Sequence, residues 1–315
     1  MAQALSTDRP GALTAADLQG SAAKRRKERL MRALFQAMAW TSVIVTALII
    51  LSLLREAISF VASVELGSLF EIGWFPRRGL FDVRTLVVGT LLVTGIAMLV
   101  AVPLGLGAAV YLSEYARPRV RRTIKPILEI LAGIPSVVLG YFALSFITPQ
   151  LLTRLVSDVT YFNLAAAGVA VGILTLPLVA SVAEDAMRAV PASLREAAYG
   201  LGSRKVTAVT KVVFPAAISG IVAAMVIGVS RAFGETMVVA IASGATGGSL
   251  FSLDVFKPGQ TMTAAMAALG VGTDQVKGAD NAFQSLFFIG TLLFVITLSL
   301  NMVGDRFVRR IREKY

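Results

Sequence analysis

Long uncharged stretches alternate with short charged segments along this 315-residue chain. An α-helix rises 1.5 Å per residue and the hydrocarbon core of a bilayer is about 30 Å thick, so about 20 apolar residues cross it. The small and polar residues that end the fifth stretch favour an external loop after one helix. The pattern predicts an all-α integral membrane protein with six transmembrane helices, within Ala33–Leu54, Thr85–Ser113, Ile130–Thr153, Val159–Ala183, Val212–Leu253 and Asn281–Gly304.

Composition supports this fold class, since 56% of the residues are hydrophobic and only 16% are charged. A net charge of +11 suggests nucleic-acid binding in a soluble protein, but here the basic residues gather in alternate loops. That is the positive-inside pattern, so both chain ends are expected in the cytoplasm (N-in, C-in), with membrane lipid and not nucleic acid as the partner. The basic clusters are Lys24–Arg32, Arg117–Lys125, Arg188–Lys211 and Arg306–Lys314.

The first apolar stretch is too long for the core of a cleavable signal peptide and lacks a small-residue cleavage pattern, so we expect it to remain as a helix. Residues 1–23, rich in alanine, serine, threonine and glycine, show no periodicity, which is typical of disorder. The expected organisation is a cytoplasmic N-terminal tail over 1–32, an additional transmembrane helix over 33–57, an external loop over 58–84, a core domain over 85–304 and a basic cytoplasmic tail over 305–315.

Several kinds of chemistry are excluded by residue content. The chain has neither cysteine nor histidine, so thiolate nucleophiles, disulfides and histidine-based metal sites or proton relays are ruled out. The glycine-rich segment Gly244–Ser249 lacks the lysine of a phosphate-binding P-loop and is interpreted as an ordinary loop. We therefore predict no catalytic residue, no metal site and no cofactor bound by this chain.

Arg231 and Glu235 stand four residues apart inside the fifth apolar stretch. Charged side chains at membrane depth usually face a protein interior or an aqueous path and mark where ions move. On a continuous helix this spacing places both heads on one face, where they neutralise each other. The alternative is a static ion pair that only fixes packing. Thr236 either donates to a substrate or bonds back to a backbone carbonyl.

A second feature is the basic segment between the fourth and fifth spans, over about 188–215. It predicts two short helices, with Pro191 in the first turn, Gly202 at the C′ position and Ser203 as the next N-cap. Such an elbow can also be an interfacial amphipathic segment. The nearby Glu184 and Asp185 are expected to be solvated at the cytoplasmic end of the fourth span.

This segment carries a family resemblance. Glu196-Ala197-Ala198, Gly202 after three residues, and Val212-x-Phe214-Pro215 resemble the E-A-A-x(3)-G-x(9)-I-x-L-P loop of bacterial ABC importer permeases. The resemblance implies the type I permease fold over the core domain. It also implies that Arg195–Gly202 forms a coupling helix that docks on an ATPase subunit, so that ATP and Mg are bound by the partner chains. We call residues 188–215 the coupling loop.

Arg231-Ala-Phe-Gly-Glu235-Thr236-Met237 is similar to the R-A-x-G-E-T-M segment of PstC-type permeases of phosphate importers, and Ala132–Val138 and Gln260–Thr263 also resemble that family. The resemblance implies a location in the bacterial inner membrane. It implies four kinds of partner: a homologous PstA-type permease, two PstB-type ATPases, a PstS-type binding protein and phosphate itself.

The residues fit an anion pathway through the substrate-site candidates Arg231, Glu235 and Thr236. A guanidinium offers five N–H donors in the fork geometry that oxyanions prefer. Glu235 then serves as the alternate partner of Arg231 when the anion has left, or pairs with a cation of the other permease. Two other functions remain open: a permease for another oxyanion such as molybdate or sulfate, and a secondary transporter or channel that uses the charge pair.

Overall fold

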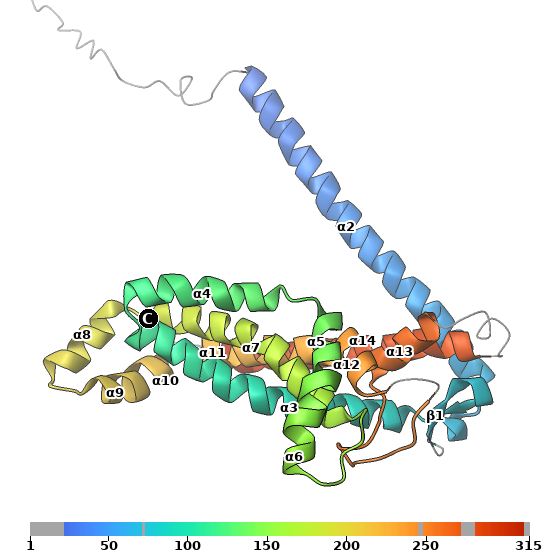
Figure 1. The fold of residues 1–315 in the computed structure, drawn as a ribbon. Helices are drawn as coiled ribbons and strands as arrows, with labels where there is room; N and C mark the ends of the chain where they lie inside the picture. Colours follow the sequence, from blue (N-terminus) through green and yellow to red (C-terminus); the bar gives the residue numbers. More distant parts are fainter. Residues whose placement is uncertain (1–21, 71–72, 245–247, 272–280, 312–315) are drawn as a thin grey trace, which may run out of the picture. The chain divides into compact units, whose positions relative to one another are not determined.

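The computed structural model of the protein describes residues 22–70, 73–244, 248–271 and 281–311 (Figure 1). The chain forms two compact units, Met1–Ser52 and Leu53–Tyr315. Helix α2 (Ala22–Ser63) begins in the first unit and ends in the second. It starts inside the expected cytoplasmic tail and extends into the expected external loop, because lysine, arginine, glutamate and alanine flank the apolar stretch and all favour helix. The expected disorder of the tail is wrong from residue 22 onward, where α2 begins, and the rest of that prediction falls on residues 1–21, outside the described residues.

The described part of the second unit is mostly helical, with one small hairpin and three π-helical segments. Its described elements are η1 (Leu66–Phe70), β1 (Trp74–Phe75), η2 (Pro76–Arg78), β2 (Leu80–Phe81), α3 (Val83–Val110), η3 (Tyr111–Tyr115), α4 (Pro118–Ala132), α5 (Ser136–Phe142), η4 (Ala143–Leu152), α6 (Thr153–Leu155), α7 (Leu164–Arg188), α8 (Ala192–Gly200), α9 (Lys205–Ala208), η5 (Val209–Val213), α10 (Phe214–Ala216), α11 (Ile218–Phe233), α12 (Met237–Ala242), α13 (Met262–Gly270) and α14 (Ala282–Ile311).

The spans agree with the predicted six. Within the described residues, five helices are long and apolar enough to cross a membrane, and a sixth span results when the helices before and after Ala217, bent by 69°, are counted as one. The third span begins at Ser136 and not at Ile130. Gly133 ends α4, and Pro135 cannot donate the backbone hydrogen bond that would continue it.

The predicted external loop contains a small folded lobe. Strands β1 and β2 pair antiparallel, with Trp74 opposite Phe81. Both side chains are buried, and their rings meet edge to face with centroids 6.0 Å apart. The lobe ends at Asp82, whose carboxylate accepts a hydrogen bond from the backbone N–H of Arg84 and so caps the first turn of α3.

Helices α3 and α7 form the centre of the second unit and lie side by side (Figure 1). Two glycines of α7 make this close approach possible. A methyl group on Gly168 would lie 2.7 Å from Ile96, and one on Gly172 would lie 2.8 Å from Val100. Lipid is as apolar as the side chains, so close packing of small residues takes over the role that hydrophobic burial has in water.

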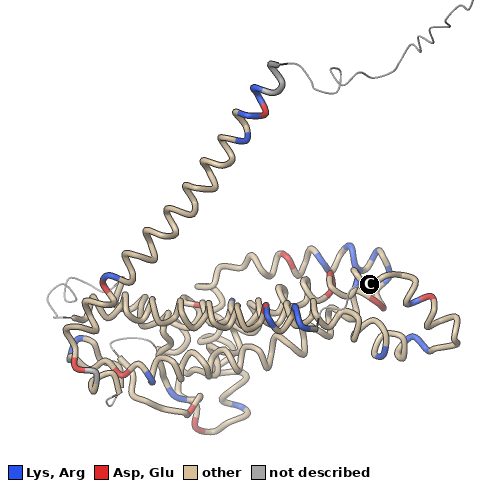
Figure 2. The backbone as a smooth tube through the Cα atoms, turned by 180° about the vertical axis from the view of Figure 1, so that it is seen from behind, with Lys and Arg blue, Asp and Glu red and all other residues tan. Residues whose placement is uncertain are grey.

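Charged residues gather toward the two ends of the helices in this unit (Figure 2). At the end that carries α8, the expectation that Glu184 is solvated proves wrong, because α4 covers α7 there. The Glu184 side chain is fully buried, 2.5 Å from Arg121 Nε and 3.1 Å from Lys125 Nζ. Lys125 also bonds the exposed Asp185 at 2.8 Å. The hydrogen bond to Asp185 is the main cause that raises the pKa of Lys125 above its usual value. The hydrogen bond to Glu184 and its negative charge add to the rise, although burial opposes it.

Candidate functional site

The charge pair lies at a break in the fifth span. Helix α11 ends at Phe233 with Gly234 as its C-cap, and α12 starts only at Met237. Arg231 is therefore in the last turn of α11, whereas Glu235 is in the non-helical link. The prediction that both project from one helix is wrong, because glycine weakens the helix here and the backbone of Glu235 is bonded elsewhere.

The two side chains nevertheless form the predicted ion pair. Nη2 of Arg231 lies 3.7 Å from Oε2 of Glu235, and the other carboxylate oxygen accepts a hydrogen bond of 3.4 Å from the backbone N–H of Val238. The Glu235 side chain is 6% exposed and that of Arg231 is 54% exposed. The carboxylate of Glu235 is thus held inside the protein, whereas the guanidinium of Arg231 has N–H donors on its exposed side.

A residue at the start of α13 forms a hydrogen bond with the backbone at the helix break. Thr263 Oγ1 donates a hydrogen bond of 2.7 Å to the carbonyl oxygen of Glu235. Thr261 caps α13 by accepting from the N–H of Ala264. Sequence reasoning placed these threonines only in a segment that resembles the family, and no local signal revealed their contact with Glu235. Thr236 bonds back to the carbonyl of Gly234 at 3.3 Å, which was the second of its two predicted alternatives.

Exposed apolar side chains precede and follow Arg231 along the chain. Ile227, one turn earlier, and Met237, just after the break, are both more than 40% exposed on the isolated chain. A charged group that faced lipid at this depth would cost several kcal/mol, roughly 2.5–3.5 on insertion scales. The exposed guanidinium therefore fits a face that meets a second protein surface or an aqueous pathway, where an anion can reach its N–H groups.

The coupling loop has the predicted elbow. Helix α8 ends in a Schellman motif, in which the N–H of Gly202 bonds Tyr199 and the N–H of Ser203 bonds Ala198, at 2.9 and 3.0 Å. Gly202 has φ +76°, which confirms its predicted C′ position. The prediction that Ser203 caps the next helix is off by one residue, since the N-cap of α9 is Arg204.

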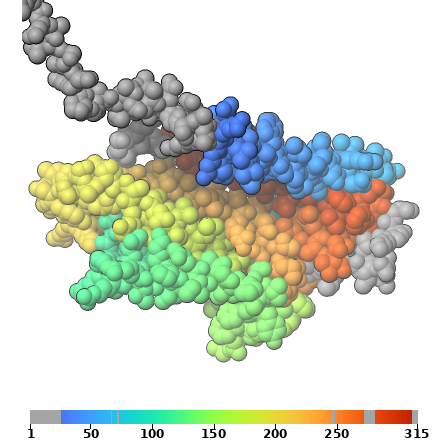
Figure 3. All heavy atoms as spheres, turned by 90° about the horizontal axis from the view of Figure 1, so that it is seen from above, coloured from blue at the N-terminus to red at the C-terminus, as the bar shows by residue number. Residues whose placement is uncertain are grey.

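One face of this loop is open and apolar. Leu201 is 88% exposed, and Tyr199 and Val206 are also exposed. In Figure 3 the loop lies at one end of its unit, in yellow. The predicted coupling residues Glu196, Ala197, Gly202 and Pro215 are exposed, whereas Ala198 is buried. Large exposed apolar side chains next to charged ones are typical of a surface that meets a partner.

Arg195 points the other way and does not share this face. Its guanidinium bonds both carboxylate oxygens of Glu114, at 2.9 and 3.4 Å, and the carbonyls of Met187 and Val190, at 2.8 and 2.6 Å. Phe214, at a position where the family pattern has leucine, packs partly buried against the apolar residues at this end. These contacts hold the loop firmly to the ends of the long helices.

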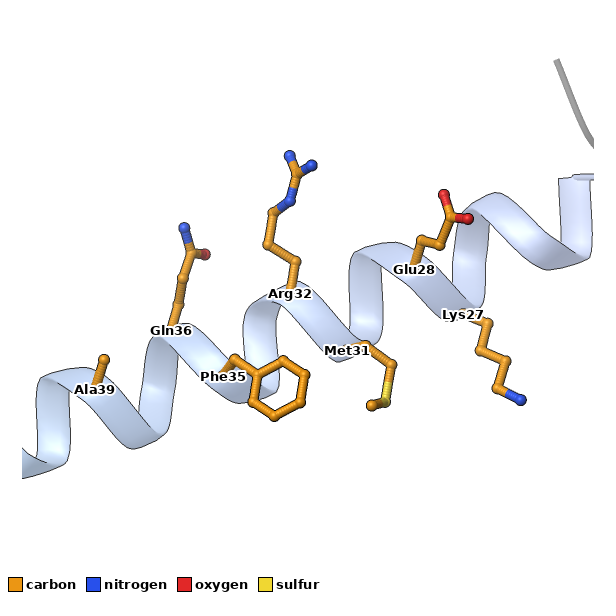
Figure 4. A pocket seen from close by; sticks show the side chains of 7 residues that line it. All are labelled: Lys27, Glu28, Met31, Arg32, Phe35, Gln36 and Ala39. Carbon is orange, nitrogen blue, oxygen red and sulfur yellow. The ribbon is translucent and has the colours of Figure 1, made fainter. Parts of the chain in front are cut away.

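A hollow along the first unit is no comparable site. It is lined by residues of α2 only, among those described (Figure 4). Glu28, Arg32 and Gln36 project from one side of the helix, and Met31 and Phe35 project from another. A lining drawn from a single helix offers no converging groups that would define a binding site.

Comparison with known families adds to this geometry. Residues 101–313 match the family described as "Binding-protein-dependent transport system inner membrane component". The chain belongs to this family. The matched region contains the coupling loop and the break with its charge pair, and it begins within α3. The protein is accordingly a multi-pass permease component of the inner membrane.

Named members of this permease family cover most of the chain. The probable ABC transporter permease protein YqgH of Bacillus subtilis is 31% identical over 231 residues, 73% of each chain. The phosphate transport system permease protein PstC 1 of Mycobacterium tuberculosis is 33% identical over 254 residues, 75% of each chain. The protein PstC of Xylella fastidiosa is 29% identical over 277 residues, 82% of this chain and 81% of the relative.

Solved structures show the same permease fold. A chain of the bacterial alginate ABC transporter, in complex with its pentasaccharide-bound periplasmic protein, aligns with a TM-score of 0.64 and 16% identity, over 92% of this chain and 97% of that one. A chain of the MetNI methionine transporter aligns with a TM-score of 0.53 and 22% identity, over 76% of this chain and 97% of that one. This confirms the predicted fold of an ABC importer permease.

Proposed function

We propose that the chain is a PstC-type permease subunit of an ATP-driven phosphate importer. The observation that carries the proposal is the half-exposed guanidinium of Arg231 held 3.7 Å from a buried carboxylate at a helix break. Support comes from relatives that are named phosphate transport system permease proteins, at 33% and 29% identity. Phosphate is a monovalent or divalent oxyanion, so it matches the forked donors of arginine.

Glu235 makes the site reversible. A charge-assisted hydrogen bond is about 2.7–2.9 Å long, so the 3.7 Å separation leaves the guanidinium of Arg231 attracted but not saturated. A phosphate that enters the site accepts hydrogen bonds from the exposed N–H groups of Arg231. The fixed carboxylate repels the same anion and offers Arg231 a partner after release, and both effects keep phosphate from binding too tightly to leave.

Coupling to ATP takes place through partner chains. In this proposal the exposed face around Glu196, Ala197 and Leu201 docks in a groove of an ATPase subunit, and Arg195 anchors α8 from behind. Two PstB-type ATPases bind ATP and Mg, a homologous PstA-type permease completes the pathway, and a PstS-type protein delivers phosphate. This chain binds no cofactor and is not itself an enzyme. Closure of the ATPases draws the coupling loops together and opens the pathway outward.

The test is transport by the purified four-component complex in proteoliposomes. We expect uptake of radiolabelled phosphate that requires the loaded binding protein and ATP inside the vesicle, and that sulfate and molybdate do not inhibit at equal concentration. Uptake that follows a proton gradient without ATP would point to a secondary transporter instead. Stronger competition by molybdate or sulfate than by unlabelled phosphate would assign the permease to another oxyanion.

A further inference from the structure

The coupling loop is bonded to η3, the π-helical segment that directly continues α3. Glu114 of η3 has a side chain only 6% exposed and accepts two hydrogen bonds from Arg195 of α8. Arg195 is bidentate on this carboxylate, so both the direction and the distance between the two elements are fixed. The π-helical turn is a conformation that occurs often at functional sites.

The second arm of the loop holds the same turn. Nζ of Lys205, the first residue of α9, lies 4.9 Å from the ring centroid of Tyr115, within the range of a cation–π contact. Leu194 of α8 and Val110 of α3 pack against one apolar cluster. Both arms of the coupling loop are therefore attached to the cytoplasmic end of α3.

The other half of α3 is attached to the support of the charge pair. Thr90 Oγ1 accepts a hydrogen bond of 3.0 Å from the backbone N–H of Met262, the first residue of α13. The backbones approach so closely that a methyl group on Gly89 would lie 2.2 Å from the carbonyl oxygen of Gln260. One residue further along α13, Thr263 holds the carbonyl of Glu235.

These two attachments are far apart along one continuous element. Twenty-four residues separate Thr90 from Glu114, which corresponds to about 36 Å at 1.5 Å per residue. Pro103 lies between them. Helix α7 packs on α3 before and after it, since Val100 faces Gly172 and Gly105 faces Val179. In Figure 1, α3 runs from the end near β1 to the end near α8, and α7 lies beside the part of it nearer α8. A close-packed helix pair transmits displacement because it has little room to deform.

We propose that α3 carries the movement of the coupling loop to the helix break at Glu235, with Glu114 and Thr90 as the positioning residues at its two ends. This inference rests on the proposed function, because it needs an ATPase below and an anion site at Arg231. Displacement of α8 by an ATPase moves η3 through Arg195. Helix α3 then shifts the start of α13, and Thr263 shifts the backbone of Glu235 relative to Arg231.

The test measures coupling in the complete transporter, reconstituted with its partner permease, ATPases and phosphate-loaded binding protein. The readouts are ATP hydrolysis with and without the binding protein, and phosphate taken up per ATP hydrolysed. Glu114→Gln removes the ion pair, and Thr90→Val removes the acceptor for Met262 with little change in shape. We expect either variant to keep basal hydrolysis and to lower the phosphate-to-ATP ratio at least fivefold.

Two further variants make the test specific. Thr90→Ser keeps the hydroxyl and should restore the ratio, which a merely structural loss of volume would not do. Arg122→Gln removes an exposed charge of α4 near the same end and should leave both readouts unchanged. The double variant Glu114→Gln/Thr90→Val should be no worse than the poorer single variant, because both residues act through one helix.

The inference is overturned if Thr90→Val and Thr90→Ser have equal ratios, or if the double variant loses the product of the two single losses. If Glu114→Gln assembles poorly, the comparison at Thr90 decides alone. The unmodified complex, measured in parallel, separates the two proposals. Absence of phosphate uptake there contradicts the proposed function, whereas normal uptake with unchanged ratios in all variants contradicts only the role of α3.

Discussion

The guanidinium of Arg231 lies 3.7 Å from the carboxylate of Glu235 across a break between two helices, and only the carboxylate is buried. The unequal burial distinguishes the two roles of the pair. A pair that served packing alone would bury both charged groups. Here the guanidinium of Arg231 is exposed and the carboxylate of Glu235 is buried. The first prediction tests this difference.

Replacement of Arg231 should impair transport, and the lysine variant, which keeps the charge beside Glu235, should do so with assembly intact. We expect Arg231→Lys, which keeps the charge and loses the fork, to lower phosphate uptake at least about tenfold, equivalent to about 1.4 kcal/mol. Arg231→Gln should abolish uptake. Uptake and yield of the complex are measured side by side.

The double variant Arg231→Gln/Glu235→Gln provides the control. If the pair only fixes packing, removing both charges relieves the stranded carboxylate and restores yield and uptake together. We expect the yield to recover without uptake. Near-normal uptake by the double variant would contradict the role of Arg231 in handling the anion.

Gly202 should tolerate asparagine far better than aspartate. Its φ of +76° strains an ordinary side chain by about 1–2 kcal/mol and strains asparagine and aspartate less, and a Cβ there meets nothing within 4 Å, so the two variants differ mainly in charge. Gly202→Asp also places a charge on the exposed coupling face. We expect normal membrane insertion with weaker ATPase association, measured by co-purification. Equal retention of the ATPase by the Asn and Asp variants would argue against docking at this face.

Glu184 should stabilise the fold more than its neighbour does. Breaking a fully buried ion pair costs about 3–5 kcal/mol, and the loss for Glu184→Gln should be smaller, about 2 kcal/mol, because Arg121 and Lys125 are partly exposed. The matched variant Asp185→Asn should change stability by less than about 0.5 kcal/mol. Thermal unfolding in detergent measures both, and equal shifts would show that the burial of Glu184 is unimportant.

Two glycines of α3 offer a paired test of the contact with Gln260. Gly89→Ala forces a methyl group against the backbone and should destabilise by about 1–3 kcal/mol, as overpacking does. Gly95→Ala, on the same helix with nothing within 4 Å, should be tolerated. Unfolding midpoints and phosphate uptake are compared. A tolerated Gly89→Ala would mean that α3 does not approach the backbone of Gln260, just before α13, this closely in the membrane.

Topology can be checked with reporters that are active only in the cytoplasm. Fusions after Arg122, Arg204 and Tyr315 should be active, and those after Arg78 and Gly259 inactive, because the basic loops remain on the cytoplasmic side. A reversed result at any of these positions would overturn the count of six spans.

The sequence alone determined the membrane class, the six spans and the elbow at Gly202. Each depends on local properties: the length of an apolar run against the bilayer thickness, and the preference of glycine for positive φ at a helix end. The charge pair at Arg231 was also visible, because charges inside an apolar tract are costly wherever the chain then folds.

The tertiary structure alone decided how these parts act on one another. At the break before Met237 the carbonyl of Glu235 is bonded by Thr263, and the burial of Glu184 depends on the cover that α4 provides. The inward turn of Arg195 depends on a carboxylate 81 residues earlier in the chain. A side chain's partner across the fold leaves no trace in its own neighbourhood, because hydrogen bonds and ion pairs are set by distances in space and not along the sequence.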